Sequence, residues 1–290
     1  MEKDLFEIFD NAADNLRIND DFISLDNYRI DSENCSGEYV YVFFSSHGLY
    51  FPTTYREFED KVKKHDYYDW MNIANNPKIR KNAKKIIFVR DIYKNWYLKG
   101  INNRINDVEK LAGFILEQSE GQRIITVGSS GGGYASILLG TLVKADYIFA
   151  FSPQTDLDRY NDFHEYKYHE LYTENKYYRP YINLSHVIAN YKGVLNYYYP
   201  ARSVEDIAMY HAVKNCNNVQ FVGLNKAAHG VVINSVSLID VLSNMDTAIT
   251  AYKKAVKHSK PISPLAYLYY TSKVKGLIQM WMRQLQKMKR

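Results

Sequence analysis

The residues whose types and spacing could support chemistry centre on Ser130. This serine has a glycine two positions before it, Gly128, and another two positions after it, Gly132. Residues 123–127 are a β-branched run that predicts a buried strand, and residues 135–140 predict a helix. The glycines let the strand and the helix pass closely at a sharp turn where the serine backbone is strained. This arrangement is typical of a nucleophilic serine.

A glycine-rich turn before a helix has a second interpretation, as a cradle for a phosphate group. No lysine follows the glycines as in a P-loop, and the spacing does not fit G-x-G-x-x-G. The nucleophile is therefore the favoured interpretation. The same turn would point the N–H of Gly131 at a developing oxyanion, at the positive end of the new helix.

A serine nucleophile needs a general base, and the base needs an acid to orient it. His229 is the predicted base because it follows the predicted strand at residues 219–224 and is flanked by Ala228 and Gly230. A loop histidine without a partner is the other interpretation. Among the remaining histidines only His47 competes, and its place after the first predicted strand suits the oxyanion hole better.

The acid is predicted to be Asp206, since it follows the penultimate strand and completes the chain order serine, acid, histidine. The other interpretation of Asp206 is a carboxylate that meets the dipole of a helix at its N-terminus. Glu205 follows the same strand, and Asp156 and Asp91 each follow another strand. These three residues remain as alternative acids.

A second oxyanion donor is expected from the loop after the predicted strand at residues 38–44. Ser46, His47 and Gly48 form this loop, and one of their backbone N–H groups would join that of Gly131. Losing one such donor typically costs about 2.7–4 kcal/mol of transition-state stabilisation.

The elements that must position these residues alternate along the chain. Strands are predicted at residues 38–44, 85–89, 123–127, 146–151, 194–199 and 219–224. A helix and a peripheral β element at residues 22–25 precede them, helices separate them, and a long helix is predicted at residues 233–257. This order predicts an α/β class with a doubly wound, mostly parallel sheet covered on both faces. Since the carboxyl ends of parallel strands share one edge, Ser130, Asp206 and His229 would meet there.

Composition bounds the class of protein. The chain has 290 residues, 46% of them hydrophobic, which is enough for one α/β domain with a full core. Two cysteines are too few for a disulfide framework or a zinc site, and we expect no metal. The acidic N-terminus lacks the apolar segment of a signal peptide, and no run approaches about 18 apolar residues. We therefore expect a cytoplasmic protein.

The net charge of +5 is unevenly distributed along the chain. No Asp or Glu follows Asp246, and the last 44 residues hold ten Lys and Arg, which leaves 27 basic against 32 acidic residues before them. This distribution argues against a nucleic-acid-binding domain. Residues 1–258 are predicted to form one domain and residues 259–290 a basic amphipathic helix.

The predicted C-terminal helix has one apolar face surrounded by Lys and Arg. That face is made of Val274, Leu277, Ile278, Trp281, Leu285 and Met288. Such a helix is expected to lie on an anionic membrane surface at the inner face, to dock on a biosynthetic partner, or to pack on its own domain.

The chain resembles the α/β-hydrolase superfamily over residues 38–257. More narrowly, it is similar to serine hydrolases encoded beside bacterial capsule and surface-polysaccharide genes. The matching pieces are residues 88–91 with 96–100, residues 127–134 and residues 150–154. The resemblance implies an acyl-serine mechanism with Ser130, Asp206 and His229 as the triad. Residues 199–203 depart from the usual pattern because they lack a glycine-then-aspartate turn.

The resemblance also implies a cap over the active site, which would be the tyrosine-rich insertion at residues 155–185. Tyrosine rings offer flat apolar faces and a hydroxyl, which suits sugar rings. Tyr160 and Tyr166 of this insertion, with Trp96 and Tyr97, are predicted to border the cleft, although Trp96 would also suit a packing role. The other interpretation of the segment is a solvated insertion.

Three hypotheses on function follow. The first is a serine esterase that removes an acyl group, such as O-acetyl, from a bacterial surface polysaccharide or its precursor and needs no cofactor. The second is an O-acetyltransferase of the same fold that takes acetyl-CoA as co-substrate. The third is a non-catalytic scaffold that binds a glycan or a partner, and it predicts that Ser130, His229 and an acid do not converge.

Overall fold

The computed structural model describes residues 8–164, 176–258 and 260–288. Within these residues lies a seven-stranded sheet in the order β1-β3-β2-β4-β5-β6-β7. The strands are β1 (Tyr28–Asp31), β2 (Tyr39–Phe44), β3 (Ala83–Val89), β4 (Arg123–Ser129), β5 (Tyr147–Phe151), β6 (Val194–Pro200) and β7 (Val219–Leu224). Only β1 runs antiparallel to its neighbour in this sheet. The predicted α/β class with a mostly parallel sheet is confirmed.

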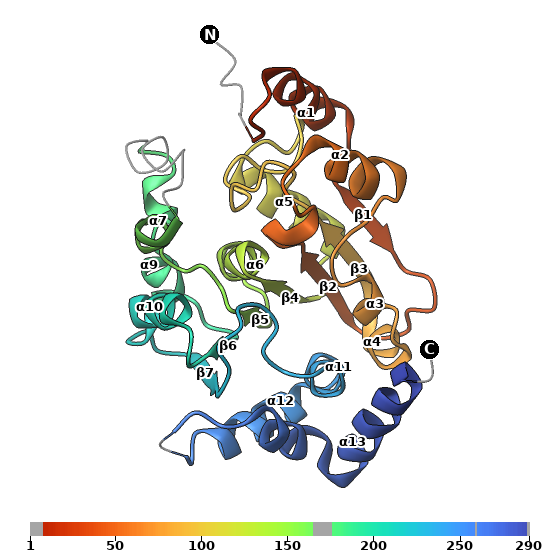
Figure 1. Cartoon of the computed structure of the whole chain (residues 1–290), viewed down its shortest axis with the longest axis vertical. Coiled ribbons are helices and arrows are strands. Elements are labelled where there is room, and N and C mark those ends of the chain that lie inside the picture. Colours follow the sequence, from red (N-terminus) through yellow and green to blue (C-terminus); the bar gives the residue numbers. More distant parts are fainter. Residues whose placement is uncertain (1–7, 165–175, 259, 289–290) are drawn as a thin grey trace.

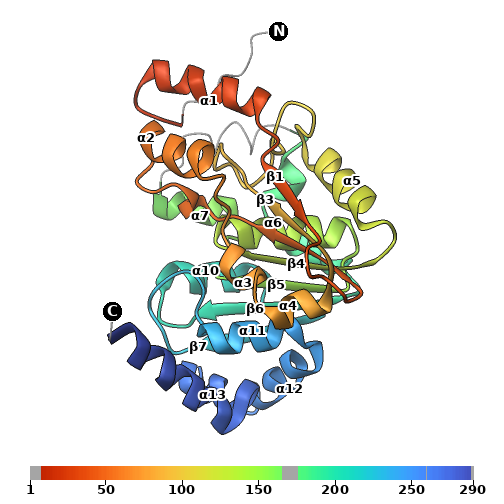
Figure 2. The same ribbon diagram turned by 90° about the vertical axis from the view of Figure 1, so that its right-hand side faces the viewer.

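Helices cover both faces of the sheet (Figures 1 and 2). Those on the first face are α1 (Ala12–Ser24), α2 (Tyr55–Phe58), α5 (Val108–Ser119), α6 (Gly131–Leu142), α7 (Leu157–His164), α9 (Ser185–Ala189) and α10 (Val204–Val213). Those on the second face are α3 (Met71–Ala74), α4 (Pro77–Asn82), α11 (Ser235–Ser243), α12 (Met245–Ala255) and α13 (Pro264–Met288). Alternating side chains of the same strands fill the two cores, since successive residues of a strand point to opposite faces. Val40 and Val42 pack in the first core, and Tyr41 and Phe43 in the second.

Two sequence predictions about secondary structure are wrong. Residues 22–25, predicted as a β element, lie at the end of α1, and the edge strand is β1 instead. Burial of Phe22 beside Tyr93, with ring centroids 4.3 Å apart, favours the helix over the intrinsic preference of this apolar run. The single long helix predicted at 233–257 is divided at Asn244, whose side chain accepts the N–H of Thr247 and caps α12.

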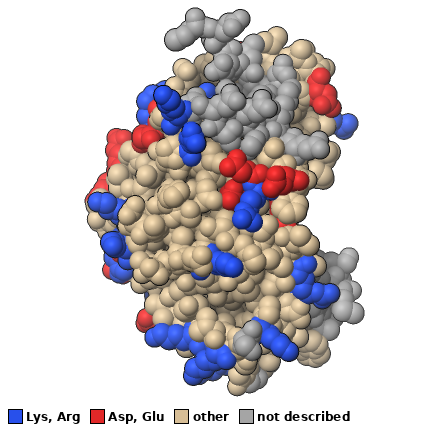
Figure 3. Space-filling view, turned by 90° about the vertical axis from the view of Figure 1, so that its left-hand side faces the viewer, with Lys and Arg blue, Asp and Glu red and all other residues tan. Residues whose placement is uncertain are grey.

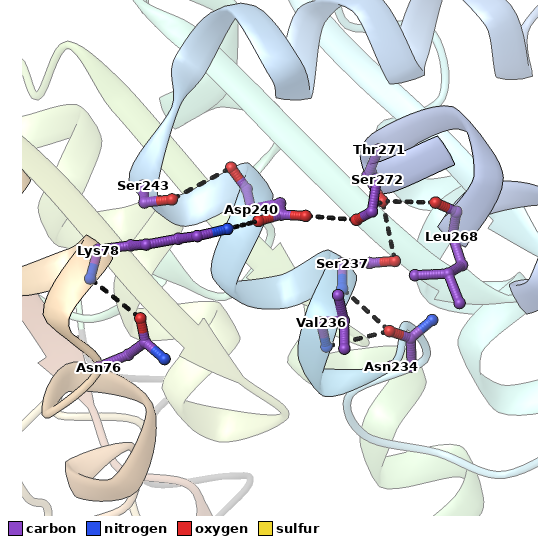
Figure 4. Close-up of polar contacts among 10 residues, drawn as sticks. All are labelled: Asn76, Lys78, Asn234, Val236, Ser237, Asp240, Ser243, Leu268, Thr271 and Ser272. Carbon is purple, nitrogen blue, oxygen red and sulfur yellow. Dashed lines mark hydrogen bonds and ion pairs between the residues drawn. The ribbon is translucent and has the colours of Figure 1, made fainter. Parts of the chain in front are cut away.

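The first part of α13 packs against the second core of the sheet rather than standing apart from it. Tyr267 is fully buried, and its hydroxyl lies 2.9 Å from that of Tyr198 on β6. Asp240 on α11 binds both Lys78 of α4 and Ser272 of α13, so three helices meet at one carboxylate (Figure 4). Lys273 has non-helical dihedral angles and divides α13 there. The domain boundary at residue 258 stays a prediction.

None of the helices in the described residues is long and apolar enough to cross a bilayer.

Candidate active site

Ser130 occupies a strained turn between β4 and α6. Its dihedral angles are φ 57° and ψ −125°, in a region that non-glycine residues rarely adopt. Its N–H donates to the carbonyl oxygen of Phe151 at 2.9 Å, which ties the turn to the end of β5. A Cβ on Gly128 would lie 1.9 Å from the carbonyl oxygen of Gly132, so the turn requires a glycine at that position. The close approach predicted from the glycine spacing is therefore present.

His229 and Asp206 are hydrogen-bonded. The Nδ1 atom of His229 lies 3.0 Å and 3.1 Å from the two carboxylate oxygens of Asp206. The Asp206 side chain is 1% exposed and that of His229 is 37% exposed, so the pair has one buried end and one accessible end. Burial lowers the pKa of His229, but the hydrogen bond and the charge of Asp206 outweigh it and hold this pKa above its ordinary value.

The end of β5 links the histidine loop to the serine turn. The Ser152 hydroxyl makes two hydrogen bonds to Gly230, the residue after His229. It accepts the N–H of Gly230 at 3.2 Å and donates to the carbonyl oxygen of Gly230 at 2.8 Å. The residue before Ser152 is Phe151, whose carbonyl oxygen accepts the N–H of Ser130. Two adjacent residues of one strand end therefore fix both loops, a role that sequence reasoning did not assign to Ser152.

The loop after β2 begins the short 3₁₀ helix η1 (His47–Leu49). Ser46 donates both its N–H and its hydroxyl to one oxygen of Asp69, each at 2.8 Å. The N–H of Gly48 in turn donates to the Ser46 hydroxyl at 3.2 Å. Within the described residues, the N–H of His47 has no acceptor, so it is the free backbone donor of this loop. Sequence reasoning missed Asp69, whose only signal is an acid inside an aromatic connection.

The His47 ring packs against the serine turn. A Cβ on Gly131 would lie 2.5 Å from its Nε2 atom, which has no hydrogen-bond partner among the described residues. Burial, with the nearby charges of Lys94 and His229, lowers the pKa of His47 to about 3. His47 is therefore neutral near pH 7, and it is poorly suited to act as the base.

The alternative acids have other partners. Glu205 lies 3.0 Å from Nε2 of His164. Asp156 accepts from Nδ2 of Asn183 at 2.7 Å and forms an ion pair with Arg159 at 3.4 Å. Neither carboxylate has a hydrogen bond to His229 in the described part of the chain.

Asp91 organises the loop that follows β3. Its carboxylate is buried and accepts the N–H groups of Tyr93, Asn95 and Tyr97 at 2.7–3.0 Å. Burial raises the pKa of Asp91 to about 6, against the effect of these hydrogen bonds. The carboxylate thus holds a tight loop rather than a histidine.

We expect Asp91→Ala to lower the free energy of unfolding by about 3 kcal/mol or more, because three buried N–H donors would lose their acceptor. Asp91→Asn, which retains one acceptor oxygen, should cost clearly less. Denaturant unfolding followed by circular dichroism measures both. Equal stability of Asp91→Ala and the wild-type protein would contradict this structural role.

The aromatic residues predicted to border the cleft differ in position. Trp96 and Tyr97 are buried: Nε1 of Trp96 donates to Gln154 at 2.7 Å, and the Tyr97 hydroxyl donates to the Ser45 carbonyl at 2.8 Å. The Trp96 ring lies edge-on to those of His47 and Tyr160, with centroids 4.9 Å and 5.1 Å away. Tyr160 thus joins the insertion to the loop after β2 through Trp96, whereas Tyr166 lies outside the described residues.

In the described part of the chain, no three His, Cys, Asp or Glu side chains gather closely enough to hold a metal ion. The chemistry that the site offers is that of a strained serine, a histidine paired with a buried acid, and backbone N–H donors.

Comparison with solved structures places this arrangement in a known architecture. The capsule O-acetyltransferase of Neisseria meningitidis serogroup A, as a variant in complex with CoA, matches with 15% identity and a TM-score of 0.50, over 81% of this chain and 91% of that one. The chain has the α/β-hydrolase fold. The esterase domain of a Rhodothermus marinus protein (14% identity, TM-score 0.46, 78% and 92% covered) and MenH from Staphylococcus aureus (11%, 0.42, 81% and 100%) also match.

These similarities lie in the fold rather than in the sequence. No protein-family model and no curated protein matches the sequence. Ser130 lies at the turn from β4 to α6, and Asp206 and His229 come later in the chain.

Proposed function

We propose that this protein is a serine hydrolase that cleaves a carboxylic ester, such as an O-acetyl ester, through an acyl-serine intermediate. The observation that carries the proposal is the His229–Asp206 pair, at 3.0 Å, fixed through Ser152 to the same strand end that holds the Ser130 turn. A serine, a base and an orienting acid are the groups that acyl transfer through a covalent intermediate requires.

In the proposed mechanism, Ser130 Oγ attacks the acyl carbonyl carbon while Nε2 of His229 takes the hydroxyl proton. Asp206 accepts the Nδ1–H of His229, which keeps Nε2 free to accept and stabilises the imidazolium that forms. The tetrahedral intermediate collapses, and the alcohol leaves with the proton from His229. Water then attacks the acyl-serine, giving its proton to His229, and the acid is released.

The oxyanion would be held by two backbone N–H groups. Gly131 is the first residue of α6, so its N–H has no acceptor within the helix. The N–H of His47 is the donor left free in the loop after β2, since Asp69 and the Ser46 hydroxyl occupy its neighbours. Neutral His47 supports this loop by packing between Gly131 and Trp96.

An acetyltransferase is the second candidate, because the capsule O-acetyltransferase with a TM-score of 0.50 is a complex with CoA. The first half-reaction would form the same acyl-serine, with acetyl-CoA as the acyl donor, no other cofactor, and the CoA thiol leaving with the proton from His229. In the second half-reaction, a sugar hydroxyl rather than water would attack the acyl-serine. In either case the substrate is an acylated small molecule or a carbohydrate, which we propose to be a bacterial surface polysaccharide or its precursor.

Labelling with a fluorophosphonate probe tests the proposal. The wild-type protein should be labelled covalently, and labelling should rise with pH as His229 loses its proton. Hydrolysis of an acetyl ester, measured with and without acetyl-CoA and a sugar acceptor, then separates the esterase from the transferase. Absence of labelling from about pH 6 to 9 would leave a non-catalytic, glycan-binding scaffold as the better account.

We also propose that the C-terminal part of α13 docks on an anionic membrane surface. Ile278 and Trp281 are 53% and 62% exposed there. The segment from residue 273 onward holds six Lys and Arg and no acid. Among the charged side chains at the lower end of the molecule in Figure 3, most are Lys and Arg, on the side where Figure 1 places α12. Exposed aromatic and aliphatic groups among cations suit the interface of anionic lipid.

Sedimentation with vesicles measures this contact. The protein should bind vesicles containing phosphatidylglycerol, bind phosphatidylcholine vesicles much more weakly, and lose binding at high salt. Trp281→Ala should weaken the binding by about tenfold. Phe163→Ala, a change at an exposed aromatic residue of α7, serves as the control. Failure to bind either vesicle type would point to a protein partner or to packing on the domain itself, and equal binding to both types would contradict recognition of anionic lipid.

A further inference from the structure

A pocket of about 600 Å³ lies beside the candidate active site, on the face of the sheet that carries α3 and α11. Its wall includes Ser129, which precedes Ser130, and Ser46, which precedes His47. Val231, two residues after His229, lines it as well. The pocket therefore touches each of the three loops that carry the proposed serine, histidine and oxyanion donor. Its volume is within the range of about 300–1,000 Å³ typical of ligand sites.

The floor of the pocket is a fixed aromatic surface. Nε1 of Trp70 donates to the carbonyl oxygen of Phe44 at 3.0 Å, and the Trp70 ring packs against Phe43 and Phe151 with centroids 6.1 Å and 5.9 Å away. Tyr67, 38% exposed, offers a second aromatic ring with a hydroxyl. Rings held in this way provide flat apolar faces without a large loss of side-chain entropy on binding.

Polar groups of the pocket are neutral with one exception, Asp69. One carboxylate oxygen of Asp69 accepts hydrogen bonds from Ser46. Burial and the charge of Asp69 raise the pKa of Tyr67. Asn72 is exposed at the pocket, whereas Asn75 is bound to Arg80. The residues that line the pocket include no Lys, Arg or His.

We propose that this pocket binds the alcohol half of the ester, an uncharged sugar ring, while its hydroxyl oxygen reaches Ser130. The inference rests on the proposed function and names the part of the substrate that this cavity takes. Trp70 and Tyr67 supply faces for the C–H groups of the ring, and Asn72 and Asp69 supply partners for its hydroxyls.

The charge of the pocket excludes the other parts of an acyl substrate. The phosphates of CoA would meet the carboxylate of Asp69 with no lining cation to balance their charge. A purely apolar acyl chain would bury Asn72 and Tyr67 without partners for their polar atoms, which is unfavourable. A neutral polyol satisfies both constraints.

The test compares two kinds of acetyl ester that differ only in the alcohol. The wild-type protein hydrolyses ethyl acetate and a panel of mono-O-acetylated methyl pyranosides of glucose, galactose and mannose. We expect kcat/KM to be about tenfold or more higher for at least one glycoside, and Tyr67→Ala and Asn72→Ala each to lower this ratio by about tenfold. Tyr269→Ala and Asn190→Ala, at exposed positions outside the pocket, are the matched controls and should keep the ratio.

Binding without chemistry separates this inference from the proposed function. The same methyl pyranosides are titrated by calorimetry into Ser130→Ala protein, and into Ser130→Ala protein that also carries Asn72→Ala. Weaker binding of the second protein supports the pocket even if fluorophosphonate fails to label the wild type. A wild-type protein that is labelled but shows no preference for any glycoside, or pocket variants that keep the preference, would overturn the inference.

Discussion

Ser130→Ala is expected to lower kcat for acetyl ester hydrolysis by at least about 10⁴-fold and to abolish fluorophosphonate labelling. The reason is that no other hydroxyl occupies the strained turn at φ 57°, so the covalent route is lost. The expected residual rate comes from the oxyanion donors and from substrate binding. Initial rates of hydrolysis at saturating substrate measure kcat directly.

His229→Ala should lower kcat by a similar factor, and the double variant should be no worse than Ser130→Ala alone. Residues that act as one unit give non-additive losses, since removing either one already removes the acyl-serine route. Ser24→Ala and His186→Ala, at exposed positions on other elements, are controls for the chemistry of each substitution. If kcat of the double variant fell by the product of the two single-variant factors, the two residues would act independently.

Asp206→Asn is expected to lower kcat by about 10²–10⁴-fold and to move the pH profile. An amide presents no full charge to Nδ1, so the preferred tautomer and orientation of His229 are lost. The carboxylate holds the pKa of His229 above its ordinary value, so removing the charge lowers that pKa. Because the base must be neutral, the rising limb of kcat/KM against pH should move to lower pH in the variant.

Glu205→Gln is the matched control for the loss of a neighbouring carboxylate. Glu205 contributes a smaller charge effect on His229 and is itself paired with His164 at 3.0 Å. We expect a small shift of the same limb in the same direction and a much smaller loss of kcat. A larger loss in Glu205→Gln than in Asp206→Asn would assign the orienting role to Glu205 instead.

The sequence by itself determined the architecture and the place of the strained serine turn. Six β-branched and aromatic runs correspond to β2–β7, because strands buried on both faces must be apolar throughout. The strained turn at Ser130 follows from local sterics, since only glycine at position 128 tolerates a backbone oxygen 1.9 Å from where a Cβ would lie. Local rules of this kind are readable without the rest of the chain.

The tertiary structure decided which polar groups meet. Asp206, Glu205, Asp156 and Asp91 all follow strands. Among these four, the fold brings Asp206 to 3.0 Å from the histidine. In the same way Asp69, 23 residues from Ser46, takes the Ser46 N–H and leaves that of His47 free.

The physical reason is that pairing of side chains depends on long-range geometry, whereas strand and turn preferences depend on neighbours in the chain. Residues 22–25 illustrate the same limit, because stacking of Phe22 on Tyr93 outweighs their local preference for a strand. Local patterns therefore identify the strands and the serine turn, and contacts between distant segments select the acid that pairs with His229.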